Sequence, residues 1–531
     1  MEKLKTLLQW LDKHLLTILV IGFIFIIPLY PKLPFRMINY TYIAIRLEDF
    51  YMVVISLAYA IQFLRKKVHV PWIMLLMFVA YWAAVFGSYY NGYFVQETIT
   101  INHLGFLHSL RRIEYMMIFF IAYTTIRSKK DFYIYLNLIL IVLFIVGIYG
   151  FGQRFIGWPA VQTMNPEFAK GYILVLDSWA RISSTFAGHY DLAAYLVLLT
   201  PIVLGCYIAT KKKIYFALFV VALGTLILTA SRASYLAYFV AVIPFLLWVR
   251  KFKLLIIVLL LTAILTPLSN NLTDRITRTF QQTQIFVDPF SGDIIIPRIR
   301  RPNILPPGNY GTNKIVLPRA ASSPSSASSS AVATPAGKIV PTKVIDSGTI
   351  AEAKALIRET VVEDAERTGK ILTPEEINAL VDSIFKSYVP VTKTLLDISV
   401  STRFQVAWPR ALAAFLTNIW LGTGPSSLGE ATDGDYFRWI GELGILGTTT
   451  FLAILGVIFI NVWKATQLMA RKIQYIYYGF LFGFAGVFFN AGYIDIFEAS
   501  KLAYTFWLVV GVFYAAIPYM IRKTPVDKLK I

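Results

Sequence analysis

The chain has 531 residues, of which 57% are hydrophobic and 15% are charged, and its formal net charge at pH 7 is +20. An ordinary soluble domain is excluded, because such domains are about 45–50% apolar and about 25% charged. The lysines and arginines flank long apolar blocks and form no stripe with interleaved aromatic residues, so we expect no nucleic-acid partner and a protein embedded among membrane lipids.

Taken in chain order, the apolar blocks predict an all-α fold, a polytopic bundle of about twelve transmembrane helices. The predicted spans are 15–30, 49–64, 71–88, 113–126, 132–151, 190–209, 214–230, 233–249, 253–268, 438–462, 474–490 and 500–520. This pattern predicts three regions: helices one to nine within 1–268, a large loop at 269–437, and helices ten to twelve with a tail within 438–531.

The connecting loops predict the orientation of the bundle. Every second loop is short and basic, for example Arg65-Lys66-Lys67 and Lys211-Lys212-Lys213. Basic residues gather on the cytoplasmic side of membrane proteins. We therefore expect both termini in the cytoplasm, with the loop 269–437 outside the cytoplasmic (inner) membrane.

The large loop itself divides into parts of different composition. Residues 291–345 are rich in Pro, Ser and Ala, which predicts a flexible insertion. Residues 349–388 regain a helical pattern, with Thr373 as the expected cap of a helix. Residues 401–420 predict an amphipathic helix on the outer membrane surface, kinked or begun at Pro409; an ordinary loop helix is the alternative.

Four arginines stand out because the predicted topology places them outside, where positive charge is disfavoured. They are Arg181, Arg232, Arg403 and Arg410. An arginine stays charged and can donate two hydrogen bonds to one phosphate, so four of them predict a site for a diphosphate at the membrane surface. For any single arginine, contact with lipid head groups is the alternative explanation.

Acidic residues gather before and inside the tenth predicted span. Asp433 and Asp435 precede the span, and Glu442 lies within it, where a carboxylate is costly and often functional. A carboxylate at this place could accept a proton from an attacking hydroxyl, so these three are the candidate catalytic residues. A solvated loop end is the alternative for Asp433.

The sequence predicts neither a metal site nor a bound cofactor. Cys206 is the only cysteine, and His103 and His108 lie five residues apart without further ligands nearby. None of the glycine-rich nucleotide-binding motifs is present in the sequence. Chemistry at the outer surface is therefore expected to depend on the arginines and the carboxylates.

Four stretches together resemble the O-antigen ligase and O-antigen polymerase family of membrane glycosyltransferases. They are RISSTF at 181–186 continuing into GHYDLA at 188–193, TASRAS at 229–234, NIWLGTG at 418–424, and DYFR at 435–438 continuing into GELGILG at 441–447. The resemblance covers about residues 180–460. Family ligases carry a histidine about where Asp433 stands, and the loop 269–437 of this chain has no histidine.

The resemblance implies transfer of a glycan from a polyprenyl-diphosphate-linked donor to a lipid, glycan or protein acceptor on the outer face of the membrane, without a metal. It also implies that Arg181 and Arg232 hold the diphosphate. A transporter or glycolipid flippase is the alternative function, because twelve spans suit it equally well. The two halves of the sequence look unrelated, which favours the glycosyltransferase. A non-catalytic scaffold is a third possibility.

Overall fold

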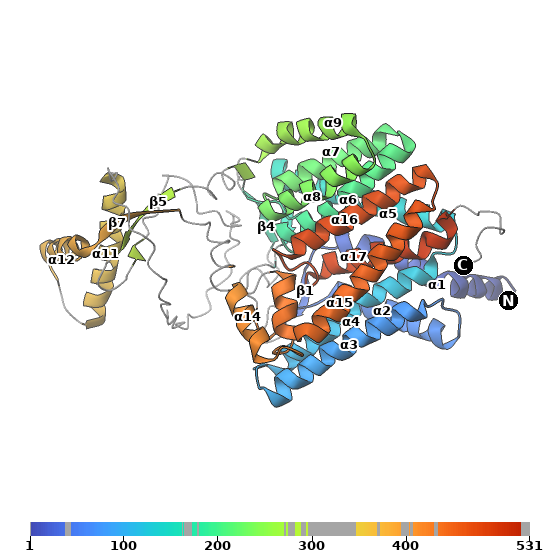
Figure 1. The fold of residues 1–531 in the computed structure, drawn as a ribbon, viewed down its shortest axis with the longest axis horizontal. Helices are drawn as coiled ribbons and strands as arrows, with labels where there is room; N and C mark the ends of the chain where they lie inside the picture. Colours follow the sequence, from blue (N-terminus) through green and yellow to red (C-terminus); the bar gives the residue numbers. More distant parts are fainter. Residues whose placement is uncertain are drawn as a thin grey trace. The chain divides into compact units, whose positions relative to one another are not determined.

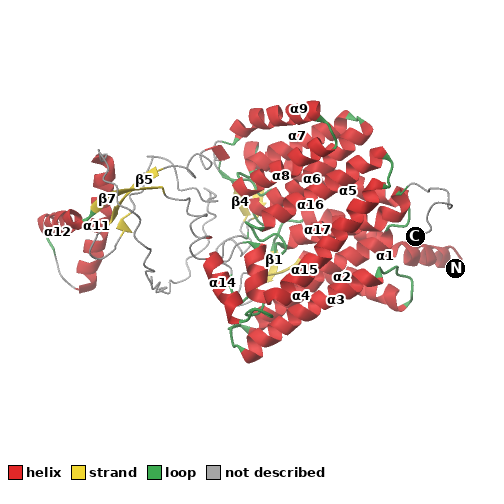
Figure 2. Ribbon diagram, viewed as in Figure 1, coloured by secondary structure: helices red, strands yellow, loops and turns green. Residues whose placement is uncertain are grey.

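The computed structural model describes residues 2–37, 44–161, 163, 173–177, 180–269, 272–273, 282–287, 294–295, 347–368, 372–394, 403, 407–429 and 434–521. The chain forms two compact units. Unit 1 comprises Met1–Thr273, Asn309–Lys314 and Ser401–Ile531, and unit 2 comprises Asp274–Gly308 and Ile315–Val400. Helices dominate the described residues of both units (Figure 2).

A helix coincides with each of the twelve predicted spans. In chain order these are α1 (Glu2–Leu29), α2 (Leu47–Leu64), α3 (Trp72–Tyr90), α4 (Asn102–Thr125), α5 (Lys129–Phe155), α6 (His189–Thr210), α7 (Lys213–Leu228), α8 (Arg232–Trp248), α9 (Phe252–Leu265), α15 (Asp435–Gln467), α16 (Arg471–Ala491) and α17 (Ser500–Met520). Figure 1 shows them packed into one bundle.

Fewer than twelve of these helices are both long enough and apolar enough to count as membrane spans. Within the described residues, seven are long and apolar enough to cross a membrane. They are Gln9–Leu29, Leu47–Leu64, Trp72–Val95, Lys129–Phe155, His189–Thr210, Asp435–Gln467 and Ser500–Met520. These helices indicate a membrane protein, whereas the predicted number of twelve spans is not confirmed. Helices α7, α8 and α9 are apolar but short.

The centre of unit 1 is α6, which is apolar and buried on all sides and packs closely against α16. A Cβ atom added at Gly479 would lie 2.4 Å from the carbonyl oxygen of Pro201, and one at Gly483 would lie 2.3 Å from that of Leu198. Two glycines four residues apart thus let the helix backbones touch. Because the pairing is antiparallel, the first residues of α6 lie beside the last residues of α16.

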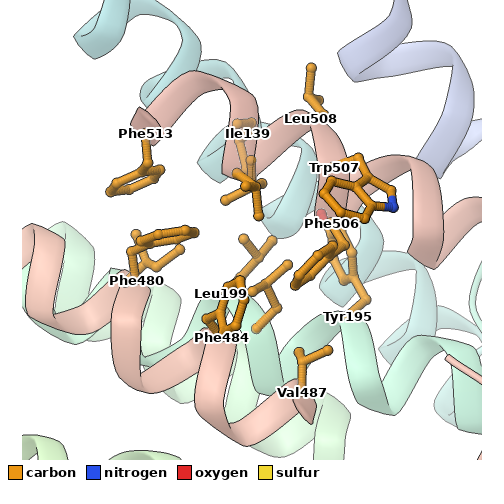
Figure 3. Packing of buried hydrophobic residues seen from close by; sticks show 14 of the residues in the cluster. Ile139, Tyr195, Leu199, Phe480, Phe484, Val487, Phe506, Trp507, Leu508 and Phe513 are labelled. Carbon is orange, nitrogen blue, oxygen red and sulfur yellow. The ribbon is translucent and has the colours of Figure 1, made fainter. Parts of the chain in front are cut away.

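Aromatic side chains fill the space between α6, α16 and α17 (Figure 3). Phe480 of α16 and Phe513 of α17 stack with ring centroids 4.4 Å apart. Nearer the start of α17, Phe484 and Phe506 lie with centroids 5.2 Å apart. This continuous core fixes the ends of the three helices, which carry the candidate site.

Short strands are the feature that the sequence did not predict. Unit 1 has two hairpins, formed by β1 (Pro34–Met37) with β2 (Ala44–Arg46) and by β3 (Pro159–Val161) with β4 (Ile173–Val175). Unit 2 has a sheet of β6 (Ile294–Ile295), β5 (Gln282–Val287) and β7 (Val389–Thr394) in that order. The β5 and β7 segments are rich in Val, Ile and Thr, which suit strands, but no apolar block marked them.

Unit 2 also contains the helices that the sequence predicted for 349–388. They are α11 (Ser347–Thr368) and α12 (Pro374–Ser387). The cap at Thr373 is confirmed, since its Oγ1 accepts a hydrogen bond from the Glu376 amide and Glu376 accepts one from the Thr373 amide. Within the predicted flexible segment 291–345, only Ile294–Ile295 is described, as β6; the remainder lies outside the described residues.

The amphipathic helix predicted for 401–420 is shorter than expected and belongs to unit 1. It is α14 (Trp408–Thr417), with Pro409 in its first turn, so the proline marks the start of the helix. Ala411 is buried against Gly441 at the beginning of α15. Leu412 and Leu416 on the same helix are exposed, as an apolar face directed toward lipid would be.

Candidate functional site

The four stretches that carry the family resemblance meet in two pairs. In the first pair, the amide of Ile182 donates a hydrogen bond of 3.4 Å to the carbonyl of Leu228 at the end of α7. This contact holds the segment with Arg181 against the turn 229–231. The turn leads directly into α8, whose first residue is Arg232.

The second pair joins the turns after α14 to a break in α15. Gly444 has φ +60 and ψ −161, so it interrupts the helix. Amides of the loop donate to the freed carbonyls, Thr423 to Gly441 at 3.0 Å and Gly424 to Glu442 at 2.9 Å. A Cβ atom at Gly444 would lie 2.5 Å from the carbonyl carbon of Trp420, so only glycine fits at this crossing.

Arg181 lies just before α6 and contacts the first residues of that helix. It is 9% exposed, and its Nη1 hydrogen bonds to Nε2 of His189. Since a guanidinium only donates, Nε2 accepts and the imidazole is neutral. The guanidinium carbon also lies 5.9 Å from the centre of the Tyr190 ring. The described partners of Arg181 are thus neutral groups.

Arg403 reaches the same end of the bundle from the segment before α14. It is 4% exposed, its Nε donates to the carbonyl of Tyr493 at 3.0 Å, and its guanidinium carbon lies 4.2 Å from the centre of the Tyr493 ring. Tyr493 also interacts electrostatically with Arg232 and Tyr190. Burial raises the pKa of Tyr493, and the positive charges of Arg403 and Arg232 oppose that rise.

We call this group, Arg181, Tyr190, Arg232, Arg403 and Tyr493, the arginine–tyrosine cluster. A buried polar chain fixes its geometry. Asn490 at the end of α16 donates to Ser234 of α8 at 2.9 Å, and Ser234 bonds to Ser231 at 2.9 Å. These bonds hold the first turn of α8, and therefore Arg232, against the turn that carries Tyr493. Asn490 was not singled out in the sequence because it lies inside an apolar span.

The backbone near Arg181 is itself constrained. Ser184 has φ +50, a left-handed conformation that costs a non-glycine residue about 1–2 kcal/mol. Gln153 of α5 compensates this cost by bonding both sides of the residue: it accepts from the Ser184 amide at 2.7 Å and donates to its carbonyl at 2.9 Å. Strain held in this way is typical of functional segments.

Two of the candidate catalytic carboxylates are buried and bonded to other groups of the protein. Glu442, 1% exposed, is bonded by Arg112 at 2.9 Å and by Arg438 at 3.3 Å. Arg112 also pairs with Glu498 at 2.8 Å, and Arg438 pairs with Asp495 at 2.7 Å. We call these five residues the ion-pair network. Arg112, with His108 and Arg438, lowers the pKa of Glu498 to about 2 although burial alone would raise it.

Asp435 has a different set of partners but the same degree of burial. It is inaccessible to solvent, and its Oδ2 accepts from the amides of Ile496 at 2.6 Å and Phe497 at 3.3 Å. These amides belong to the loop 492–499, which also carries Tyr493 and Asp495. Asp435 therefore holds this loop directly, and Glu442 does so through Arg112 and Arg438. A role as general base stays a prediction for both.

A third group of buried charges lies where α1 ends and where α2, α6 and α17 begin. The Lys501 ammonium is fully buried and donates to the carbonyls of Pro28, Tyr30 and Thr185, so it ties the segment after Arg181 to the end of α1. Glu48 bonds to Ser500 at 2.9 Å. These contacts make Lys501 a positioning residue for the cluster.

Lys32 joins this third group from the loop after α1 and is 4% exposed. Burial, together with the neighbouring Arg46, lowers the pKa of Lys32 to about 8, against the opposing effect of Glu48 and Asp191. Since Asp191 follows Tyr190 directly in α6 and interacts with Lys32, this third group of charges lies next to the arginine–tyrosine cluster.

The structure thus brings together three of the four predicted arginines, whereas the fourth is exposed. Arg410 is exposed on α14, and none of the described contacts of Tyr190 or Tyr493 involves it. Asp433 lies outside the described residues. The sequence did not identify His189, Tyr190 or Tyr493 as site residues, although the first two lie within a quoted motif. No protein-family model and no curated protein sequence matches this chain.

Proposed function

We propose that this chain is a membrane glycosyltransferase of the O-antigen ligase and polymerase type, which moves a glycan from a polyprenyl-diphosphate-linked donor to an acceptor hydroxyl or amine. One observation carries the proposal. Arg181, Arg232 and Arg403, which lie far apart in the sequence, meet around two tyrosines at one end of the bundle. Several guanidinium groups held in a fixed arrangement are suited to a diphosphate.

The reaction follows from the charges. The bond between the sugar carbon and the diphosphate oxygen breaks, and its electron pair leaves with the diphosphate. Arginines placed around that group stabilise the charge as it develops. The acceptor oxygen or nitrogen bonds to the same sugar carbon, and its proton passes to a general base. Asp433 remains the predicted base, because Asp435 and Glu442 are occupied by other partners.

The proposal includes a topology in which all twelve helices that coincide with the predicted spans cross the inner membrane. Both termini are then cytoplasmic, the segment 269–437 is outside, and the arginine–tyrosine cluster lies at the outer surface within reach of a lipid-linked donor. Single cysteines placed at Ser326 and Lys528 in a Cys206→Ala background test it with an impermeant thiol reagent. In intact cells we expect labelling at position 326 only; labelling at 528 alone would refute this orientation.

The decisive experiment for the function is Arg232→Ala. Removing one charge-assisted hydrogen bond costs about 1.5–3 kcal/mol, so glycan transfer should fall about ten- to a hundredfold or more. Arg232→Lys should restore little, since lysine keeps the charge but cannot donate in a fork. The measurement is transfer from purified lipid-linked donor by equal amounts of folded protein.

Arg471→Ala is the matched control, because Arg471 lies at the opposite end of α16. We expect the control to transfer glycan at the wild-type rate. Near-normal transfer by Arg232→Ala would mean that this arginine contacts lipid only, and the proposed function would lose its main support.

A further inference from the structure

A cavity lies at the other end of α2 and α17 from Glu48 and Lys501, which are at the starts of these helices. Its volume is about 920 Å³, within the range of small-molecule sites. The walls come from α1, from the end of α2 and the turn after it, from the end of α4, and from the end of α17. The arginine–tyrosine cluster, by contrast, lies beside the first turn of α6 and the last turn of α16.

The lining of this cavity is positively charged. Lys13, Lys67 and Arg127 contribute three cations, and Asp12 contributes the single carboxylate. That carboxylate already has internal partners, since it pairs with Arg65 and with Lys67. Lys13 and Arg127 therefore provide positive charge to the cavity that Asp12 does not neutralise, which suits an anionic ligand.

A buried hydrogen-bond acceptor in the lining requires that the ligand also carry a donor. Gln62 is 3% exposed, and its Nε2 donates to Oδ1 of Asp12 at 2.9 Å. Since Asp12 only accepts, this bond fixes the orientation of the amide. The other end, Oε1, is buried and has no hydrogen-bond partner. The phosphate of a phosphodiester cannot satisfy it, because that group carries no proton and Oε1 needs a donor such as a hydroxyl.

Apolar surroundings point to a lipid. The cavity is lined in part by Leu16, Ile126 and Pro518. Near it, Trp10 is 50% exposed and Tyr519 is 44% exposed. Exposed Trp and Tyr at one level of a helical bundle are typical of the boundary between lipid and water.

We propose that this cavity binds the headgroup of a membrane lipid that carries both a phosphate and a hydroxyl, as phosphatidylglycerol does. Lys13 and Arg127 hold the phosphate, and Gln62 accepts from the hydroxyl. The site is separate from the proposed transfer reaction, and binding alone tests it. The experiment is native mass spectrometry of the purified full chain with phosphatidylglycerol, phosphatidic acid and phosphatidylcholine of identical acyl chains.

The test variant is Lys13→Gln with Arg127→Gln. The control is Lys66→Gln with Lys129→Gln, which also removes two charges, next to Lys67 and near Arg127 in the sequence but outside the cavity lining. We expect wild type and control to prefer phosphatidylglycerol, and the test variant to bind it about tenfold less. Equal binding by test and control variants, or equal binding of phosphatidylcholine by the wild type, would overturn the proposal.

Two further arms test the details of recognition. Gln62→Met removes the unpartnered acceptor, so the preference for phosphatidylglycerol over phosphatidic acid should disappear while both lipids still bind. A preference unchanged in Gln62→Met refutes the hydroxyl contact. Soluble glycerol phosphate should compete only at much higher concentration than the lipid. Competition at equal concentration would show that the site takes a soluble phosphate ester and would overturn the assignment to a lipid.

Discussion

The arginine–tyrosine cluster and the ion-pair network are neighbouring groups of buried charge with opposite construction. In the network, Glu442 faces Arg112 and Arg438, so opposite charges neutralise each other inside the protein. In the cluster, the contacts of Arg181 and Arg403 include a histidine, two aromatic rings and a carbonyl.

The difference teaches what each group can do. Paired charges hold helices and loops in place, and removing one partner leaves the other buried without compensation. Positive charges against aromatic rings keep their capacity to attract an anion. The comparison predicts that network variants lose stability, and that cluster variants remain folded and lose donor binding. The experiments on Glu442, Arg403 and Asp435 measure both stability and donor binding or transfer.

The largest effect is expected in the network. Glu442→Ala leaves Arg112 and Arg438 without their shared carboxylate, so it should lower the free energy of unfolding by about 3–5 kcal/mol. The readouts are thermal unfolding in detergent and the yield of folded protein. Glu359→Ala, which removes an exposed carboxylate from α11, is the control and should unfold like wild type. A stable Glu442→Ala protein that fails in glycan transfer would restore Glu442 as a catalytic candidate.

The cluster should respond in the opposite way. Arg403→Ala is expected to retain wild-type unfolding but to bind the lipid-linked donor about ten- to a hundredfold more weakly. The sequence predicted the same role for Arg403 and Arg410, whereas in the structure Arg403 is buried and Arg410 is exposed. We therefore expect Arg410→Ala to weaken donor binding less than Arg403→Ala, as measured by titration with the donor. Equal effects would show that the cluster extends to α14.

Asp435 lies between the two groups, because it holds the loop that contributes to both. Asp435→Asn keeps the shape but replaces one acceptor by a donor that faces a backbone amide, which should cost about 1–3 kcal/mol of stability. If Asp435 positions Tyr493, the variant should raise the apparent KM for the donor more than it lowers kcat. A loss of kcat at unchanged KM and unchanged stability would instead support a catalytic carboxylate.

The sequence revealed the helices and the three arginines of the cluster. It did not reveal the residues that position them, for physical reasons. Long apolar blocks identify helices because each must bury its whole surface in core or lipid. Arg232 was recognisable because a very short turn rarely carries a charge on that side. Tyr493 and Asn490 gave no such signal, since their role depends on the close approach of α6 and α16 at Gly479 and Gly483.

The carboxylates show a second reason why the site could not be predicted fully from the sequence. Because Glu442 lies inside a predicted span, the sequence favoured a catalytic role for it, but its partners in the structure are Arg112, 330 residues away, and the nearby Arg438. A contact between residues so distant cannot be inferred from one sequence without the fold. A buried acid alone therefore does not separate a catalytic role from a structural one.

The smallest effect concerns Lys32, which tests whether the third group of buried charges carries a real cost. Its pKa is about 8 in the folded protein against an ordinary 10.5, so the unfolded chain binds more protons between these values and stability should rise with pH across that window. From about pH 7 to about pH 9 the gain should be about 1 kcal/mol. Lys32→Met removes the titrating group and its cost of burial, so we expect the variant to be more stable than wild type at pH 7. That difference in thermal unfolding should shrink by about 1 kcal/mol by pH 9. A difference between the two proteins that stays constant with pH would show that Lys32 keeps its proton, stabilised by Glu48 and Asp191, and that the charges of this group are as well paired as those of the network.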